Sequence, residues 1–210
     1  GDWESGQEYL AKARRHPQAS QAPEVGRLNE RLVNGLQARL WIMRGELGLA
    51  EQWARDSGLI ARSISDILSS AGQRAAGSEF VHNDYLTLAR LYLAQNKPAA
   101  ALEVIDSLLS VAGAVGYMRR VIQILVLKAL ALQQMRQGPP AVDALGQALA
   151  LAEPEGYLRV FLDEGELIVP ILYQAVERGI AVNYVKKILA VFPHYGFSAA
   201  APGEKKFKVD

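Results

Sequence analysis

The chain has 210 residues, half of them apolar, and its 23 basic and 22 acidic side chains leave a formal net charge of +1. This length fits one large domain or one repeat array, and so small a charge gives no electrostatic footprint for nucleic acid or an acidic membrane. The sequence has no cysteine, which excludes disulfides, thiolate nucleophiles and Cys-ligated zinc and is compatible with a cytoplasmic location, and it has no uninterrupted apolar run of about 18 residues, so no membrane span is expected.

Helical periodicity continues along the chain, and breakers divide it into segments. Residues 2–16 are interpreted as the outer helix of a hairpin whose first helix is missing. Three helical hairpins with short turns are predicted next: 23–44 with 47–68, 79–95 with 98–113, and 117–136 with 139–153. The small and polar residues 69–79 predict a loop between the first two hairpins.

The C-terminal part continues in helices. Residues 155–179 predict a short helix and a longer one, and Pro170 either starts or kinks the longer one. A last helix, residues 182–192, ends before a proline. We therefore expect one repeat domain over residues 1–192 and a linker or tail over residues 193–210.

Small residues recur at a fixed place in the three hairpins. Ala38, Ala89 and Ala129 lie in the first helices, and each is followed twelve positions later by another alanine, at 50, 101 and 141. Helices joined by so short a turn lie antiparallel, and their backbones approach closely only where side chains are small. This frame resembles the tetratricopeptide repeat (TPR). It predicts an all-α fold of antiparallel hairpins stacked in a right-handed superhelix, whose concave face binds the ligand.

Two longer runs carry a closer resemblance. "GYMRRVIQILVLKALALQQM" and "ALGQALALAEPEGYLRVFLDEGE" are similar to the TPR-like sensor region of MalT-like (LAL-type) LuxR-family bacterial transcription regulators. The resemblance implies an ATP-binding module before this region and a helix-turn-helix domain after it. The chain itself has no G-x-x-x-x-G-K-[ST] phosphate loop. ATP hydrolysis and DNA binding are therefore expected only in modules missing from this chain.

Two arginines occupy the same repeat position, directly after the small residue of a first helix. Arg39 and Arg90 are predicted to point into the concave groove, where the third copy has Leu130. Two guanidinium groups on neighbouring helices could bind a carboxylate, a phosphate or an acidic peptide. The alternative is that both are surface arginines paired with local acids such as Asp84.

Further groove residues follow from the same helical geometry. Asn83, Leu86, Gln123 and Val126 are expected to face the groove near the two arginines. Weaker candidates for the same pocket come from the segments that carry the family resemblance: Arg119, Arg120, Tyr157 and Arg159.

The polar residues that could carry chemistry have simpler interpretations. His82 and Asp84 are expected to lie at the start of a helix and to cap it. Asp163 and Glu164, in "FLDEGE", precede an apolar run, and one of them is expected to cap a helix N-terminus. No nucleophile with a base in reach and no metal-ligand spacing is recognised, so neither an enzyme nor a cofactor is predicted.

The sequence therefore predicts a regulatory domain. A small-molecule inducer, or a protein or peptide, would bind in the concave groove, and the binding would be transmitted to ATPase and DNA-binding modules outside this chain. The alternative is a general TPR scaffold for protein–protein interaction without a small-molecule ligand, with self-association along the stack as a variant.

Overall fold

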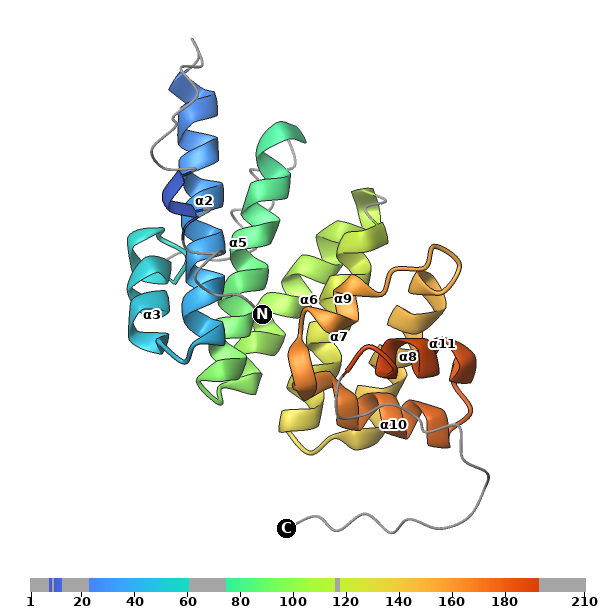
Figure 1. The fold of residues 1–210 in the computed structure, drawn as a ribbon. Helices are drawn as coiled ribbons and strands as arrows, with labels where there is room; N and C mark the ends of the chain where they lie inside the picture. The colour runs from blue at the N-terminus through green and yellow to red at the C-terminus, as the bar shows by residue number, and fades with distance from the viewer. Residues whose placement is uncertain (1–7, 9, 13–22, 61–74, 116–117, 193–210) are drawn as a thin grey trace.

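The structure, a computed structural model, describes residues 8, 10–12, 23–60, 75–115 and 118–192. Within these ranges every regular element is a helix, as the all-α prediction requires (Figure 1). Residues 8 and 10–12 are helical, and the rest of the helix predicted over residues 2–16 lies outside the described residues.

Three helical hairpins form first, and a group of shorter helices follows. The hairpins are α2 (Pro23–Met43) with α3 (Leu47–Asp56), α5 (Ala75–Ala94) with α6 (Pro98–Val115), and α7 (Met118–Gln134) with α8 (Gly138–Ala152). The shorter elements are α9 (Arg159–Leu162), the 3₁₀ helix η1 (Gly165–Ile168), α10 (Val169–Glu177) and α11 (Val182–Leu189). Pro170 lies in the first turn of α10, where its missing N–H has no intrahelical acceptor to lose, so it starts this helix and does not kink it.

Three predicted boundaries are wrong. Helix α11 ends at Leu189, before the predicted end at residue 192. Helix α3 ends at Asp56, and the turn after it contains Gly58 at a φ of +68°, where the chain leaves the helix. Helix α5 begins at Ala75, inside the loop predicted over residues 69–79. Small residues favour a loop, but alanine has the highest helix propensity of all, so the two criteria give opposite predictions for residues 75 and 76. Residues 61–74 lie outside the described part.

The turns inside the three hairpins have the same geometry. One residue in each adopts a left-handed conformation: Gly45 (φ 76°), Asn96 (φ 57°) and Arg136 (φ 59°). The next residue donates its N–H to the carbonyl five positions back, and these bonds are Glu46 to Trp41, Lys97 to Tyr92, and Gln137 to Leu132. This is the hydrogen-bonding of a Schellman helix end. The turn residues are 51 and 40 positions apart, the same intervals that separate the predicted small residues.

The predicted small residues lie in the core of the helical stack. Ala38, Ala89 and Ala129 are completely buried. The alanine twelve positions after each of them, at 50, 101 and 141, is completely buried as well. Each first helix packs against its own second helix. The repeat frame predicted from the sequence is thereby confirmed, while the hand of the superhelix and the boundary at residues 192–193 stay predictions.

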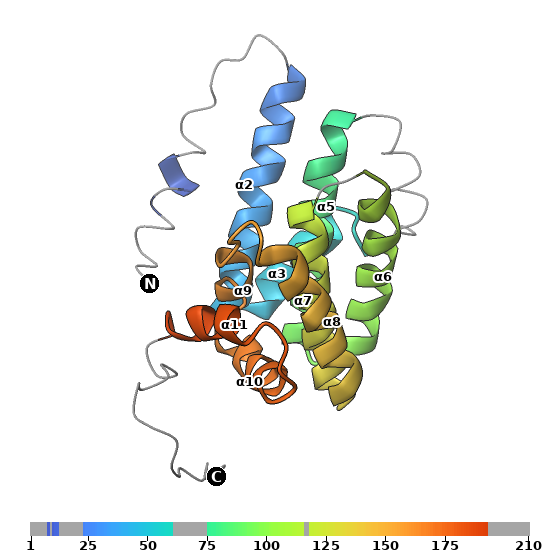
Figure 2. The ribbon, with the colours of Figure 1, turned by 90° about the vertical axis from the view of Figure 1, so that its right-hand side faces the viewer.

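The first helices of the hairpins carry the site. Helix α2 packs against α5, and α5 packs against α7. Elements α9 and η1 turn back from the C-terminal side and contact α7, as Figures 1 and 2 show. The residues from Arg159 to Ile168 are called the 159–168 segment below. No helix in the described ranges is both long and apolar enough to cross a lipid bilayer.

Candidate functional site

A small pocket opens along the first helices. Its volume is about 100 Å³, and α2, α5 and α7 contribute its walls. Five of the ten predicted site residues line it: Arg39, Asn83, Leu86, Arg90 and Gln123. Its other lining residues are Leu32, Gly35, Leu36, Asp84 and Thr87.

Arg90 forms a buried ion pair with Glu164 of the 159–168 segment. Its Nε lies 3.1 Å from both carboxylate oxygens of Glu164, and its Nη2 lies 2.5 Å from Oε1. The side chains are only 11% and 6% exposed. Burial alone would lower the pKa of Arg90, but the attraction of Glu164 outweighs it and the pKa is raised. Arg90 therefore stays charged, and the bidentate pair fixes the 159–168 segment to α5.

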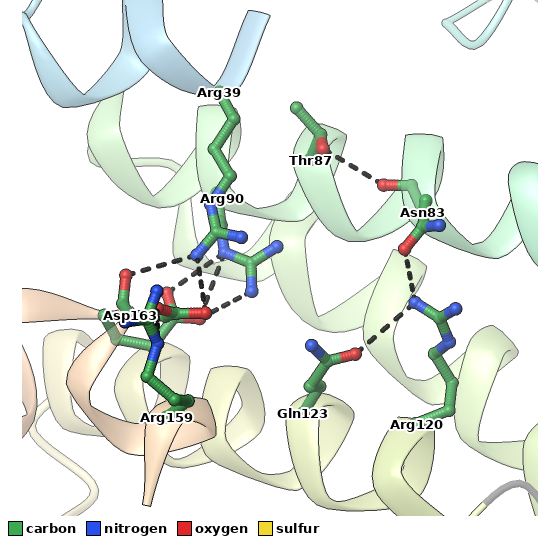
Figure 3. Close-up of polar contacts among 9 residues, drawn as sticks. Arg39, Asn83, Thr87, Arg90, Arg120, Gln123, Arg159 and Asp163 are labelled. Atoms are coloured by element: carbon green, nitrogen blue, oxygen red, sulfur yellow. Dashed lines mark hydrogen bonds and ion pairs between the residues drawn. The ribbon is translucent and has the colours of Figure 1, made fainter. Parts of the chain in front are cut away.

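Arg39 makes a looser contact with the neighbouring acid. Its Nη2 lies 3.3 Å from the main-chain oxygen of Asp163 and 3.6 Å from the Oδ2 of the same residue. Asp163 is shared with Arg159, whose Nε lies 3.6 Å from its Oδ1 (Figure 3). Burial lowers the pKa of Arg39, and the positive charge of Arg90 lowers it further, against the effect of the two acids. Arg39 is thus the less well compensated of the two pocket arginines.

A second ion pair closes the other end of the pocket. Asp84 on α5 accepts a hydrogen bond from the Nε of Arg31 on α2. Burial raises the pKa of Asp84, although the charge of Arg31 acts in the opposite direction. A Cβ atom added to Gly35 would lie 3.0 Å from Oδ1 of Asp84. Glycine at this place on α2 therefore leaves the space that the carboxylate uses.

Polar groups line the wall between α5 and α7. The Nη1 of Arg120 donates to Oδ1 of Asn83, and it lies 3.4 Å from Oε1 of Gln123 (Figure 3). The hydroxyl of Thr87 donates to the main-chain oxygen of Asn83 at 3.0 Å. Arg120, itself a predicted site residue, is thus linked by hydrogen bonds to residues that line the pocket. The pocket combines guanidinium, amide and hydroxyl groups with leucine side chains.

The comparisons with known proteins agree with the repeat geometry. The sequence model of the family described as the MalT-like TPR region matches residues 1–178. The chain belongs to this family. No curated protein and no solved structure matches the chain. A MalT-like TPR region fits a regulatory or sensor role in general, and such all-helical regions are typically non-catalytic.

Four of the predicted site residues lie apart from the pocket of this MalT-like TPR region. Arg119 is exposed and does not line it. Val126 is completely buried in the core and does not line it. Tyr157 is half-buried and packs against the core cluster. Arg159 has an 84% exposed side chain and contacts Asp163, which in turn contacts Arg39. The prediction that Val126 faces the groove is therefore wrong, and the binding roles of all ten residues stay predictions.

The two capping interpretations are also wrong. Asp84 lies well inside α5, which begins at Ala75, and its carboxylate pairs with Arg31. Glu164 precedes η1, but its side chain makes no capping hydrogen bond and turns to Arg90. Asp163 follows α9, and its side chain faces Arg39 and Arg159. The side chain of His82 lies outside the described part.

The raised pKa of Asp84 predicts a pH dependence of stability. Because the folded state favours the protonated form, stability from this group is full below the ordinary aspartate pKa of about 3.9 and is lost as the pH rises through the raised value. Asp84→Asn removes this dependence. We therefore expect wild type to lose stability relative to Asp84→Asn over this interval, measured by urea unfolding at a series of pH values. A difference that is constant with pH, or of the opposite sign, would contradict it.

Proposed function

We propose that this chain is the effector-sensing region of a LuxR-type transcription regulator. The effector would bind at the concave pocket, and the change would pass to ATP-binding and DNA-binding modules outside this chain. The observation that supports this is the meeting of two repeat-equivalent arginines, Arg39 and Arg90, with Asn83 and Gln123 at one pocket. Convergent polar groups beside apolar side chains are typical of ligand sites.

The position of the 159–168 segment supports a route for the signal. Asp163 and Glu164, in the middle of this segment, contact the pocket arginines, and the segment continues directly into α10, which α11 follows. An effector that prefers one arrangement of the segment over another would shift the position of the C-terminal helices. The difference in affinity between the two arrangements sets how large that shift can be.

A thermal-unfolding screen tests the sensing role. The chain is heated with sugars, sugar phosphates, nucleotides, amino acids and other metabolites, and an effector present at about 100 times its Kd adds about 2.7 kcal/mol of apparent stability. The increase is expected to disappear in Arg39→Ala and to persist in Arg178→Ala, whose exposed side chain pairs with Asp143 away from the pocket. A stabilisation that survives Arg39→Ala would reject this pocket as the site.

A specific observation favours the scaffold as the second candidate. Leu32 and Leu36 lie one helical turn apart on α2 and are 37% and 47% exposed beside the pocket. An amphipathic helix of a partner could cover such a row. If no metabolite stabilises the chain but a saturable protein partner does, this second function replaces the first. A full-length protein without nucleotide-binding and helix-turn-helix modules would reject the regulator context.

A further inference from the structure

We infer that the pocket binds the head group of a small organic monoanion with a short apolar arm, and that this anion competes with Asp163 for Arg39. A carboxylate of about six carbons is the simplest such compound. The inference rests on the proposed function, because it names the chemical class of the effector at the same pocket. Four features of the described residues carry it: the spare positive charge of Arg39, the size of the pocket, its apolar rim and the acid at its far end.

The charge of Arg39 points to an anion. Its contacts with Asp163 are long, at 3.3 and 3.6 Å, and Asp163 is shared with Arg159. Arg90 in contrast donates to Glu164 from two nitrogens, Nε and Nη2, at 2.5–3.1 Å. Three guanidinium groups therefore face two carboxylates in this cluster. An arginine at the wall of a pocket whose N–H groups make only long contacts favours the binding of a carboxylate there.

The size of the pocket limits what enters it. Ligand sites for drug-sized molecules enclose roughly 300–1,000 Å³, and this pocket encloses about 100 Å³. A head group and a few carbons fit, but a larger ring system does not. The rest of the ligand must lie outside the pocket mouth, along α2.

The rim of the pocket accepts an apolar arm. Leu32 and Leu36 are partly exposed on α2, and Leu86 is buried in the wall. An alkyl chain placed along the two exposed leucines would remove apolar surface of both partners from water. The polar wall with Asn83, Thr87 and Gln123 offers hydrogen bonds only near the head group.

The acid at the far end excludes a second negative charge. Asp84 lines the pocket and is compensated by Arg31, so a dianion would bring its second carboxylate towards an acid whose counter-ion is already engaged. Like charges at short range are repelled in a partly buried site. The pocket therefore prefers a monoanion over a dicarboxylate of the same length.

Competition with Asp163 links this ligand to the 159–168 segment. Arg39 cannot give its best hydrogen bonds to the ligand and to Asp163 at once, so binding weakens one of the two ionic contacts that hold the segment. The Arg90–Glu164 pair remains. With the ligand bound, the segment is held less tightly to α2 and stays attached to α5. The segment therefore has two arrangements, one held by both arginines and one held by Arg90 alone, and a ligand can shift the equilibrium between them.

Calorimetric titration with three six-carbon probes tests the inference: hexanoate, hexan-1-ol and adipate. Hexanoate is expected to bind saturably and about tenfold or more tightly than either the neutral or the doubly charged probe. Arg39→Gln should reduce hexanoate affinity about tenfold, and Arg178→Gln should leave it unchanged. Asp163→Asn should increase it several-fold, because the internal competitor is removed. A purely structural role for Asp163 predicts no such gain.

A second variant guards against loss of folding. Leu36 is 47% exposed, so Leu36→Glu should fold normally, as far-UV circular dichroism would show, while its carboxylate repels hexanoate from the rim. Absence of saturable hexanoate binding, binding unaffected by Arg39→Gln, or weaker binding in Asp163→Asn would each overturn the inference. If hexanoate fails while a compound of the metabolite screen still stabilises the chain through Arg39, only the ligand class is rejected. If both fail, the proposed function is rejected with it.

Discussion

Glu164→Ala is expected to destabilise the fold by about 3–5 kcal/mol, because it leaves the Arg90 guanidinium buried without its counter-ion. The pair is 11% and 6% exposed, so water can do little to solvate the remaining charge. Urea unfolding followed by far-UV circular dichroism measures the loss. The cost should appear mainly as a lower midpoint with an unchanged slope, since the surface exposed on unfolding is nearly the same.

Two further variants give the matched controls for Glu164→Ala. Arg178 and Asp143 form an exposed pair at 3.2 Å, and Asp143→Ala should cost only about 0–1 kcal/mol. The double variant Arg90→Met with Glu164→Leu replaces both charges by apolar groups and should recover most of the loss. If Glu164→Ala costs no more than Asp143→Ala, the buried pair does not persist in solution and the 159–168 segment is not held by it.

The repeat frame could be predicted from the sequence because its causes are local. Ala38 and Ala89 occupy the same position in the first helix of a hairpin, and both are completely buried. Gly45 and Asn96 both take the left-handed conformation that a short helix–helix turn requires. Alanine spacing and a turn-forming residue are both visible within about fifteen residues of sequence, so the hairpins follow without knowledge of the rest of the chain.

The contacts between the 159–168 segment and the pocket arginines could not be predicted in the same way. The partners in the two ion pairs are 124 and 74 positions apart, Arg39 with Asp163 and Arg90 with Glu164. An acidic pair before an apolar run has a local explanation as a helix cap, and sequence offers no reason to reject it. Only the fold of the C-terminal helices brings these acids over α2 and α5.

The errors within the site have a geometric cause. Gln123 lines the pocket, whereas Val126, three residues further along α7, is buried in the core. Residues three apart share one side of a helix but differ by about 60° around its axis. That difference is enough to move a side chain from the groove to the contact with a neighbouring helix. The periodicity of the sequence predicts which side of the helix faces the groove. Packing against neighbouring helices then determines which residues on that side stay accessible.

Phe161→Ala is the second large effect that we expect, at about 3–5 kcal/mol, because it removes a completely buried ring. Phe161 lies in α9 and packs edge-on against Tyr184 of α11, with ring centroids 6.2 Å apart and planes at 83°. Leu167→Ala is the control in the same segment, because Leu167 is 66% exposed and should cost about 0.5 kcal/mol or less. Equal losses for the two variants would contradict the observed burial.

The combination of Phe161→Ala with Glu164→Ala tests whether the ring and the ion pair hold the 159–168 segment together. If each anchors the segment independently, the two losses add to within about 0.5 kcal/mol. If the ring positions the acids, its removal already weakens the Arg90–Glu164 pair, and the double variant should lose about 0.5–3 kcal/mol less than the sum. We expect the second result, because only two residues separate Phe161 from Glu164. Strict additivity would mean that the segment can leave Arg90 without disturbing α11, and the proposed route from the pocket to the C-terminal helices would fail.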